Sequence, residues 1–408
     1  MTNVTDTVTA GVFLGDRRVG TLGYRDGNTW FDYEDRDPVH PILGQAFEAN
    51  PEKRRTASGS IPEWFANLLP ETGSGLRNLI GRELGRSNPH DFQVLIFLGE
   101  DLPGAVRVVP ESDITVIPEL VKKSPADGMA KVRFSLAGVQ AKFSMRWEGK
   151  GLVLPMSGQG GDWIVKLPDR RFPEVPANEY AMLSWAKRVG IDVPDIRLFT
   201  GADLYGLPDD LIRPEEAAFA VRRFDRLDAG RVHQEDFAQV REVAVATKYD
   251  KATYTGLARF ISAVCPQDVE EYLRRLTAIV VMGNLDAHLK NWTLRYPGGA
   301  TARLSPAYDF VSVSSYDEFR AEELAFPVNG GKVARLITLD NFRSLARRAH
   351  LEPDQVTRVV SETVAALADT WSEVKHAAPV PPFVVSHVER RLASLPLIAE
   401  VKRHSSSS

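Results

Sequence analysis

The stretch GNLDAHLKNWTL, residues 283–294, contains the polar residues on which the interpretation of this sequence turns. It follows an apolar segment with helical spacing, residues 269–282, and it precedes a strand-like run. Asp286 and Asn291 stand five positions apart in it, and Asp309 follows after a predicted hairpin. These side chains offer two carboxylates and one amide oxygen, which are ligand types that suit Mg²⁺.

This spacing is typical of the catalytic loop and metal-binding residue of protein kinases. Phosphoryl transfer needs a carboxylate beside the attacking hydroxyl and oxygen ligands for the Mg²⁺ that bridges the phosphates. Asp286 is therefore a candidate catalytic base, and Asn291 and Asp309 are candidate Mg²⁺ ligands. The alternative for Asp286 and Asn291 is a helix cap or turn, because both residue types favour such positions. The later aspartate and an upstream lysine favour the catalytic interpretation.

The upstream lysine is Lys166, which lies near the end of the apolar run DWIVKLP, residues 162–168. A charged lysine is unusual on an apolar strand, and binding of phosphate oxygens by its ammonium group would account for its presence there. Glu179 lies later in a predicted helix, and a strand lysine paired with a helix glutamate is the arrangement by which kinases orient the α and β phosphates. The alternatives are a surface lysine at a strand end and an acidic residue in a first helical turn.

The stretch FSLAGVQAK, residues 134–142, contains small residues that let backbone N–H groups approach a phosphate closely. It matches neither the P-loop nor the GxGxxG pattern, so taken alone it is a weak signal. The stretch SGQGG, residues 157–161, is richer in glycine, but its position between two predicted strands favours a turn.

Composition narrows the class of protein. The chain has 408 residues, which predicts two or three domains. A net charge of −4 argues against a protein whose main task is to coat nucleic acid. The single cysteine, Cys265, excludes an internal disulfide and favours a reducing compartment. Neither a signal-peptide pattern nor an apolar run long enough to cross a bilayer is present, so we expect a cytoplasmic protein without a membrane partner.

Sequence periodicity changes twice along the chain. Asp26-Gly27 separates two apolar runs and predicts a hairpin, whereas residues 61–100 have helical spacing. Residues 131–225 are strand-rich with one helix from about Asn178 to Arg188, and later residues are mostly helical. We predict an α+β, two-lobe protein-kinase-like fold with three parts. They are a small N-terminal α+β subdomain (1–110), a β-rich lobe (111–225) that begins with a linker, and a helical C-terminal lobe (226–408).

Several motifs, in this order, resemble the HipA kinase family, and the resemblance extends from about residue 11 to residue 395. The motifs are VGTL (19–22), WFANLLP (64–70), DF (91–92), FSLAGVQAK (134–142), IVKLP (164–168), NEY (178–180), AVRRFDR (220–226), HQEDF (233–237), GNLDAHLKN (283–291) and YD (308–309).

The resemblance implies a role for each matching residue. Asp286 would be the catalytic base, with His288 and Lys290 touching nucleotide or substrate, and Asn291 and Asp309 would bind Mg²⁺. The remaining residues implied to bind ATP are the backbone of Ala137, Gly138, Val139, Gln140, Ala141 and Lys142, the phosphate-binding Lys166 with Glu179 as its ion-pair partner, the hinge residues Arg222, Arg223 and Phe224, and Tyr308.

The resemblance also implies a biology. A protein of this family would use ATP and Mg²⁺ as cofactors. Its substrate would be a protein such as an aminoacyl-tRNA synthetase, and Ser135 would be a site of autophosphorylation. A HipB-like DNA-binding antitoxin would neutralise the toxin and would make the contact with operator DNA. Two departures from the family pattern are Arg222, where many relatives have an acidic residue, and Ala287, which is often larger or polar.

Three further alternatives remain open at this point. A catalytically silent partner would hold a repressor on DNA without phosphorylating anything, but it would be free to lose Lys166 or Asp286. A small-molecule kinase would use the same phosphoryl-transfer core. A metal site in HQED, residues 233–236, is disfavoured because consecutive side chains point in different directions, so a structural role for this motif is expected.

Overall fold

The computed structural model describes residues 7–34, 41–51, 54–56, 60–111, 142–154, 160–208, 210–250 and 252–405. Ser135 and residues 137–141 lie outside the described residues, as does most of the predicted linker.

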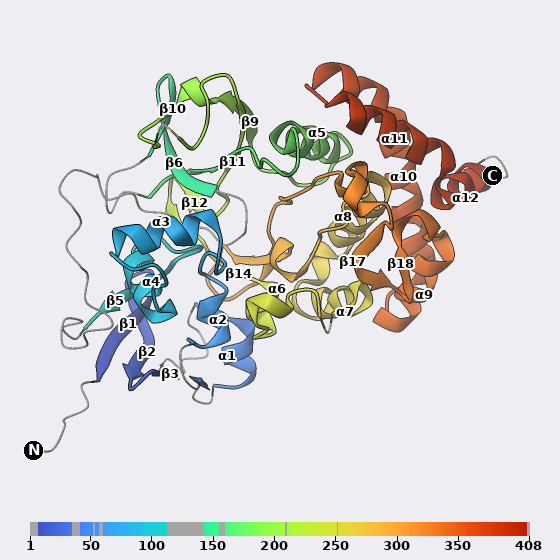
Figure 1. The fold of residues 1–408 in the computed structure, drawn as a ribbon. Helices are drawn as coiled ribbons and strands as arrows, with labels where there is room; N and C mark the ends of the chain where they lie inside the picture. The colour runs from blue at the N-terminus through green and yellow to red at the C-terminus, as the bar shows by residue number, and fades with distance from the viewer. Residues whose placement is uncertain are drawn as a thin grey trace, which may run out of the picture.

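The N-terminal unit is an antiparallel sheet in the order β4-β3-β2-β1-β5, covered by short helices (Figure 1). Gly15 and Gly27 have φ values of 63° and 76°, which favour glycine, and they turn the chain between neighbouring strands. Its core is rich in aromatic rings, among them Phe31, Phe47 and Phe65. The elements are β1 Val8–Leu14, β2 Arg17–Arg25, β3 Asn28–Tyr33, α1 Gln45–Ala49, β4 Arg54–Thr56, α2 Glu63–Ala66, α3 Gly75–Glu83, α4 Asp91–Leu98 and β5 Val106–Pro110.

The β-rich lobe is a sheet in the order β10-β7-β6-β8-β11-β9, in which only the β10–β7 pair is parallel. The register places Lys142 of β6 opposite Lys166 of β8, so two lysines stand side by side at one end of the sheet. The elements are β6 Lys142–Glu148, β7 Gly151–Val153, β8 Trp163–Lys166, α5 Val175–Arg188, β9 Ile196–Thr200, β10 Leu204–Tyr205 and β11 Ala217–Arg222.

The C-terminal lobe is mainly helical and also contains short strand pairs. Gly283 ends α8 with φ 70°, and a Cβ there would lie 1.9 Å from Ser314 Oγ, so glycine is required where the chain turns into the quoted stretch. The elements are β12 Arg226–Leu227, β13 Gly230–Arg231, β14 His233–Asp236, α6 Phe237–Val240, α7 Tyr254–Val264, α8 Val269–Met282, β15 Thr293–Tyr296, β16 Arg303–Leu304, β17 Glu323–Val328, β18 Gly331–Val333, α9 Leu339–Ala349, α10 Pro353–Ala377, α11 Pro382–Ser394 and α12 Pro396–Ser405.

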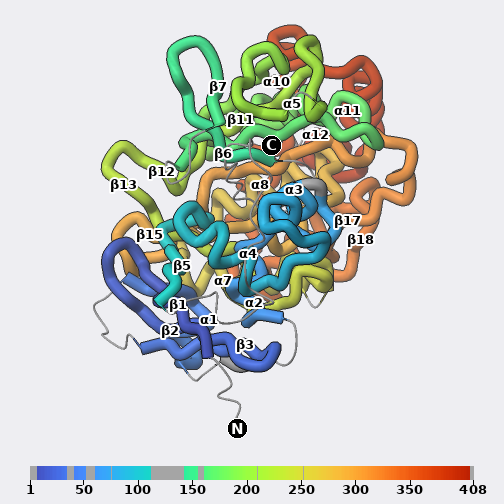
Figure 2. Tube along the Cα trace, turned by 60° about the vertical axis from the view of Figure 1, so that its left-hand side comes forward, coloured from blue at the N-terminus to red at the C-terminus, as the bar shows by residue number. Residues whose placement is uncertain are grey.

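Hydrophobic packing crosses the boundaries between the three parts. Trp185 of α5 packs against Trp371 of α10 with 4.6 Å between ring centroids, so the helix of the β-rich lobe belongs to the core of the helical lobe. Phe143 and Val165 share a core with the N-terminal unit. Figure 2 shows the N-terminal sheet and the C-terminal helices at opposite ends of the molecule. The exact boundaries at residues 110 and 225 remain a prediction.

The predicted α+β, two-lobe arrangement is confirmed, and the segment with helical spacing over residues 269–282 forms helix α8 with those bounds. The expectation that the earlier helix begins near Asn178 is wrong by one turn. Helix α5 begins at Val175, because Pro176 fits a first helical turn, where its missing N–H is not needed. Within the described residues, every helix is too short or too polar to cross a bilayer.

Candidate active site

A cavity of about 760 Å³ opens where the three parts of the molecule meet. The β-rich lobe contributes Lys166, the helical lobe contributes Asp286 and Asp309, and the N-terminal unit contributes Asn67 and Glu71. Residues from widely separated parts of the sequence therefore share one concave site, as is usual for small-molecule sites between domains.

Lys166 is one of the residues that line this cavity. Its Nζ atom lies 2.5 Å from Glu179 Oε1, and it also forms an ion pair with Asp309. Both Lys166 and Glu179 are buried, at 4% and 1% exposure, so Lys166 is not a surface residue at a strand end. Burial lowers the pKa of Lys166 to about 8, although the Glu179 carboxylate acts in the opposite direction. Lys142 Nζ lies 3.5 Å from Asp309 Oδ2, so two ammonium groups face one carboxylate.

Asp309 has the left-handed φ of 57°, which is uncommon for a residue with a side chain and is often found at functional sites. The side-chain amide of Asn284 donates to the Asp309 carbonyl at 3.1 Å and holds this conformation. Asn291 Nδ2 donates to Asp309 Oδ2 at 3.3 Å. Asn291 Oδ1 is buried, and none of the described residues hydrogen-bonds it. An unpartnered amide oxygen beside a carboxylate is a donor set that fits Mg²⁺.

Asp286 stands at the opening of the candidate catalytic loop, residues 283–291, shortly after the turn at Gly283. Its backbone N–H donates to Asn284 Oδ1 at 3.2 Å, and its carbonyl accepts from the His288 N–H at 2.8 Å. The carboxylate is exposed to the cavity but is surrounded by protein, and the loss of solvent raises the pKa of Asp286. The hydroxyl of Tyr249 donates to Asp286 Oδ1 at 2.5 Å and acts in the opposite direction.

His288 and Lys290, the other predicted residues of this loop, have different surroundings. His288 is buried, which keeps its pKa well below the ordinary value, and its Nδ1 atom has no hydrogen-bond partner among the residues that the structure describes. A neutral ring with one open nitrogen can hydrogen-bond a ligand in the cavity. The Lys290 ammonium instead lies 2.6 Å from the Asn67 carbonyl and 2.9 Å from Asp236 Oδ2. This geometry favours an anchor between the loop and the N-terminal unit over contact with substrate.

The predicted nucleotide edge is formed by Phe224 and Tyr308, whose ring centroids are 5.8 Å apart. The Tyr308 hydroxyl donates to the Lys290 carbonyl at 2.8 Å, which fixes its ring against the catalytic loop. Arg222 is exposed, and its guanidinium lies 3.9 Å from Asp195. Its side chain therefore reaches the surface, where it also lies 3.7 Å from Asp228.

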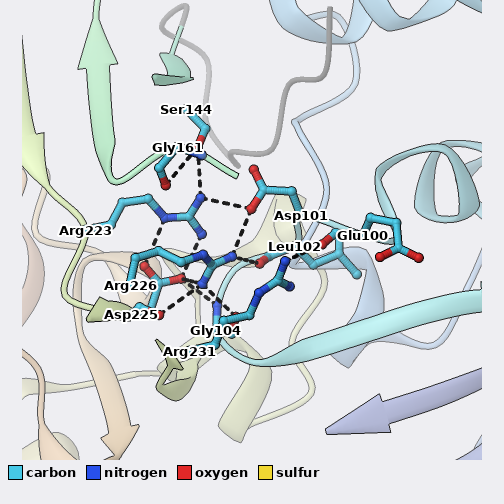
Figure 3. A network of polar contacts seen from close by, with 10 residues as sticks. All are labelled: Glu100, Asp101, Leu102, Gly104, Ser144, Gly161, Arg223, Asp225, Arg226 and Arg231. Atoms are coloured by element: carbon cyan, nitrogen blue, oxygen red, sulfur yellow. Dashed lines mark hydrogen bonds and ion pairs between the residues drawn. The ribbon is translucent and has the colours of Figure 1, made fainter. Parts of the chain in front are cut away.

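The Arg223 side chain is buried in a polar network with Asp225, Arg226 and Asp101 (Figure 3). Arg223 pairs with Asp225 at 2.8 Å and with Asp101 of the N-terminal unit at 3.3 Å. Arg226 Nη2 lies 2.9 Å from Asp101 Oδ1. Although burial alone would raise it, the two arginine charges hold the pKa of Asp225 below its usual range. The predicted hinge is thus tied to the N-terminal unit through the Arg223–Asp101 and Arg226–Asp101 ion pairs.

The HQED motif, residues 233–236, forms a second set of hydrogen bonds to the N-terminal unit, in addition to those of the Arg223 network. His233 Nε2 lies 2.7 Å from the Leu43 carbonyl. Glu235 is fully buried and accepts hydrogen bonds from the Gln45 N–H and from Trp64 Nε1 at 2.8 and 3.0 Å. Within the part of the chain that the structure describes, no cluster of three histidine, cysteine or acidic side chains is placed to hold a metal ion. The structural role expected for this motif agrees with these contacts.

Several residues of the site were not predicted from the sequence. Asn284 lies inside the quoted stretch, and its supporting role beside Asp309 could have been inferred from that position. Tyr249, Lys248 and Glu71 come from other segments, and only tertiary packing brings them to the catalytic loop. Ser135 and residues 137–141 of the predicted phosphate loop lie outside the described residues, whereas Lys142 at its end is described.

Two family models match this chain. The model of the HipA N-terminal domain matches residues 10–109, and the model of the HipA-like C-terminal domain matches residues 134–371. The second match alone spans more than half of the chain.

Individual relatives agree with these matches. The chain is 36% identical over 394 residues to Y4dM of Sinorhizobium fredii, which is named as a candidate kinase, and the match covers 94% of this chain and 96% of that protein. It is 25% identical to the serine/threonine-protein kinase toxin HipA of Shewanella oneidensis, over 87% of this chain and 90% of that one.

A solved structure shows the same fold. It is the Shewanella oneidensis HipA in a complex with HipB and operator DNA, with a TM-score of 0.70, 22% identity and 97% coverage of both chains. The architecture, the two family matches and the full-length similarity to Y4dM lead to one conclusion: this chain belongs to the HipA family of kinases.

Proposed function

We propose that this chain is an ATP-dependent serine/threonine protein kinase of the HipA toxin type. The observation that carries the proposal is the convergence of a buried Lys166–Glu179 ion pair with Asp309 and Asn291 in one cavity that also contains Asp286. A strand lysine paired with a helix glutamate, beside two candidate metal ligands and a carboxylate that lines the cavity, is the set of groups that phosphoryl transfer requires.

Asn291 and Asp309 would hold Mg²⁺, which supplies positive charge to the phosphates when it is bound. Lys166 and Lys142 face Asp309 and would add their charges to the same phosphate oxygens. Phe224 and Tyr308 would flank the base of the nucleotide, with the hinge backbone at its edge. His288 would donate or accept one further hydrogen bond through its open ring nitrogen.

Asp286 would orient the acceptor hydroxyl and take its proton late in the transfer. The bond between the γ-phosphorus and the oxygen of the leaving ADP breaks, and a bond to the serine or threonine oxygen forms. Asp286 suits this role because its carboxylate lines the cavity and its backbone is held at the start of the loop by hydrogen bonds with Asn284 and His288.

The proposal extends to substrate and partners. Membership of the HipA family supports a protein substrate of the aminoacyl-tRNA synthetase class and autophosphorylation at Ser135. The complex in which the Shewanella HipA was solved supports a HipB-like DNA-binding antitoxin as the partner, through which operator DNA would be reached.

The test is incubation of the purified chain with radiolabelled ATP, Mg²⁺ and a cell lysate, followed by identification of labelled proteins. We expect label on the chain itself at Ser135 and on at least one lysate protein, and no label with the Asp309→Asn variant. A chain that binds a HipB-like antitoxin on DNA but transfers no phosphate would contradict the proposal and would favour a silent co-repressor.

A further inference from the structure

The side chain of Tyr249 makes a hydrogen bond to the candidate catalytic carboxylate. Its hydroxyl lies 2.5 Å from Asp286 Oδ1, and its ring lies edge-on to the ring of His288, with 5.1 Å between centroids. Tyr249 is 44% exposed, so it adds little to the core. Within the described residues, no other side chain hydrogen-bonds the Asp286 carboxylate.

Tyr249 is held in place from two sides. The backbone carbonyl of Lys248 accepts a hydrogen bond from the Leu289 N–H of the catalytic loop at 3.4 Å. The Lys248 ammonium lies 2.7 Å from Glu71 Oε1 of the N-terminal unit and 5.5 Å from the centre of the Tyr249 ring. Both Lys248 and Glu71 are largely buried, at 12% and 17% side-chain exposure, so this contact is fixed more firmly than an open surface ion pair.

We propose that Tyr249 is a positioning residue for phosphoryl transfer: its hydroxyl holds one oxygen of Asp286 and leaves the other to the acceptor hydroxyl, and Lys248 and Glu71 hold Tyr249 in turn. This inference rests on the proposed kinase function. It also gives the N-terminal unit a part in catalysis. Glu71 of that unit holds Lys248, and the neighbouring Tyr249 holds Asp286.

The surroundings of Tyr249 keep its hydroxyl protonated, so that it can donate a hydrogen bond to Asp286. Although Tyr249 as a whole is 44% exposed, desolvation of its phenol raises its pKa well above the ordinary value and the Asp286 charge raises it further, so the phenol remains a donor at neutral pH. A phenol that donates to a carboxylate favours its ionised form, which is the form that can accept a proton. A carboxylate has enough lone pairs for Tyr249 and for one acceptor hydroxyl together.

The charges around Asp286 come from several elements. Lys248 and Lys142 lower the pKa of Asp286 and Glu71 raises it. Loss of the Tyr249 hydroxyl removes a contribution that lowers this pKa. The transfer rate falls as the pH falls through the pKa of the base, so its acidic limb should move to higher pH in Tyr249→Phe.

The experiment compares the wild type with Tyr249→Phe and with Tyr205→Phe, a change at an exposed tyrosine of β10 that serves as a matched control. Single-turnover transfer from radiolabelled Mg-ATP is measured from pH 5 to 9, to the chain itself and to dephosphorylated casein. We expect about a tenfold lower rate at neutral pH for Tyr249→Phe, because hydrogen bonds to charged groups are among the stronger ones. The Kd for Mg-ATP and the melting temperature should stay unchanged, and Glu71→Gln should give a smaller effect in the same direction.

A second measurement follows Asp286 directly. The carboxyl ¹³C signal of Asp286, assigned with Asp286→Asn, should titrate at higher pH in Tyr249→Phe than in the wild type. An unchanged rate with an unchanged titration would overturn the inference, and a higher rate would show that Tyr249 blocks the acceptor position instead. A wild type that transfers no phosphate would overturn the proposed function itself, and the inference with it.

Discussion

The ammonium of Lys166 and the carboxylate of Glu179 are 2.5 Å apart in a site where both side chains are buried. A buried pair of this kind contributes little net stability, but removal of one partner leaves an uncompensated charge. The pair therefore links the geometry of the nucleotide site to the stability of the β-rich lobe, and the two effects can be separated by mutation.

Lys166→Ala should abolish phosphoryl transfer and also destabilise the chain by about 3 kcal/mol, because Glu179 is left buried without its partner. The double variant Lys166→Met with Glu179→Met should recover most of that stability and none of the activity. Urea unfolding and an ATP transfer assay measure the two quantities. Equal stability of Lys166→Ala and the wild type would show that the pair is solvated.

Asp309→Asn should remove Mg²⁺-dependent transfer, because an amide cannot replace a charged ligand that faces Lys166 and Lys142. Asn291→Asp is the matched variant: it keeps an oxygen ligand and should retain part of the activity at raised Mg²⁺ concentration. The rate measured against Mg²⁺ concentration tests both variants. Wild-type transfer by Asp309→Asn would contradict the metal assignment.

The network around Arg223 should make stability depend on acid pH. The pKa of Asp225 is held below its ordinary value, so its contribution is complete above about pH 4 and is lost as the pH falls toward its pKa in the folded protein. Asp225→Asn should remove this slope and cost about 3 kcal/mol near neutral pH. Asp228→Asn, a change at an exposed carboxylate near Arg222, is the control and should leave the unfolding curves unchanged.

Glu235 should make the stability of the chain fall as the pH rises, which is opposite to the effect of Asp225, and it should do so in a higher pH range. Burial raises the pKa of Glu235 to about 7, although hydrogen bonds from Tyr296 and Gln45 lower it. The folded state therefore holds a proton that the unfolded state releases near pH 4.5. The resulting contribution to stability is present below that pH and is lost as the pH rises toward 7. Glu235→Gln should reduce the change of the unfolding midpoint with pH between the pKa of Glu235 in the unfolded chain and about pH 7. A wild-type midpoint that is already flat there would contradict a protonated Glu235.

Local sequence patterns predicted the parts of this molecule that depend on local physics. The spacing of Asp286 and Asn291 reflects one loop, and Gly283 marks its start, so these residues could be placed without a structure. The pairing of Lys166 with Glu179 could also be predicted, because the sequence around each residue indicated a strand and a helix respectively. The helices α11 and α12 were not predicted, and the start of α5 was placed one turn too late.

The contacts of the N-terminal unit could not be predicted, because they join segments far apart in the chain. Nothing near Glu71 or Asn67 indicates that they reach Lys248 and Lys290. Arg223 was assigned to the hinge, whereas its alternation with Asp225 was a local hint of a buried ion pair.

The most direct test of the account is the Asp286→Ala variant, measured for Mg-ATP binding by calorimetry and for phosphoryl transfer in parallel. Lys166, Asn291 and Asp309 remain in this variant, so we predict an unchanged Kd for Mg-ATP with transfer reduced by at least about 100-fold, in the range attributed to general base catalysis. Expression without an antitoxin should arrest growth for the wild type and not for the variant. Loss of ATP binding together with transfer would show that Asp286 is structural, and undiminished transfer would contradict its role as the base.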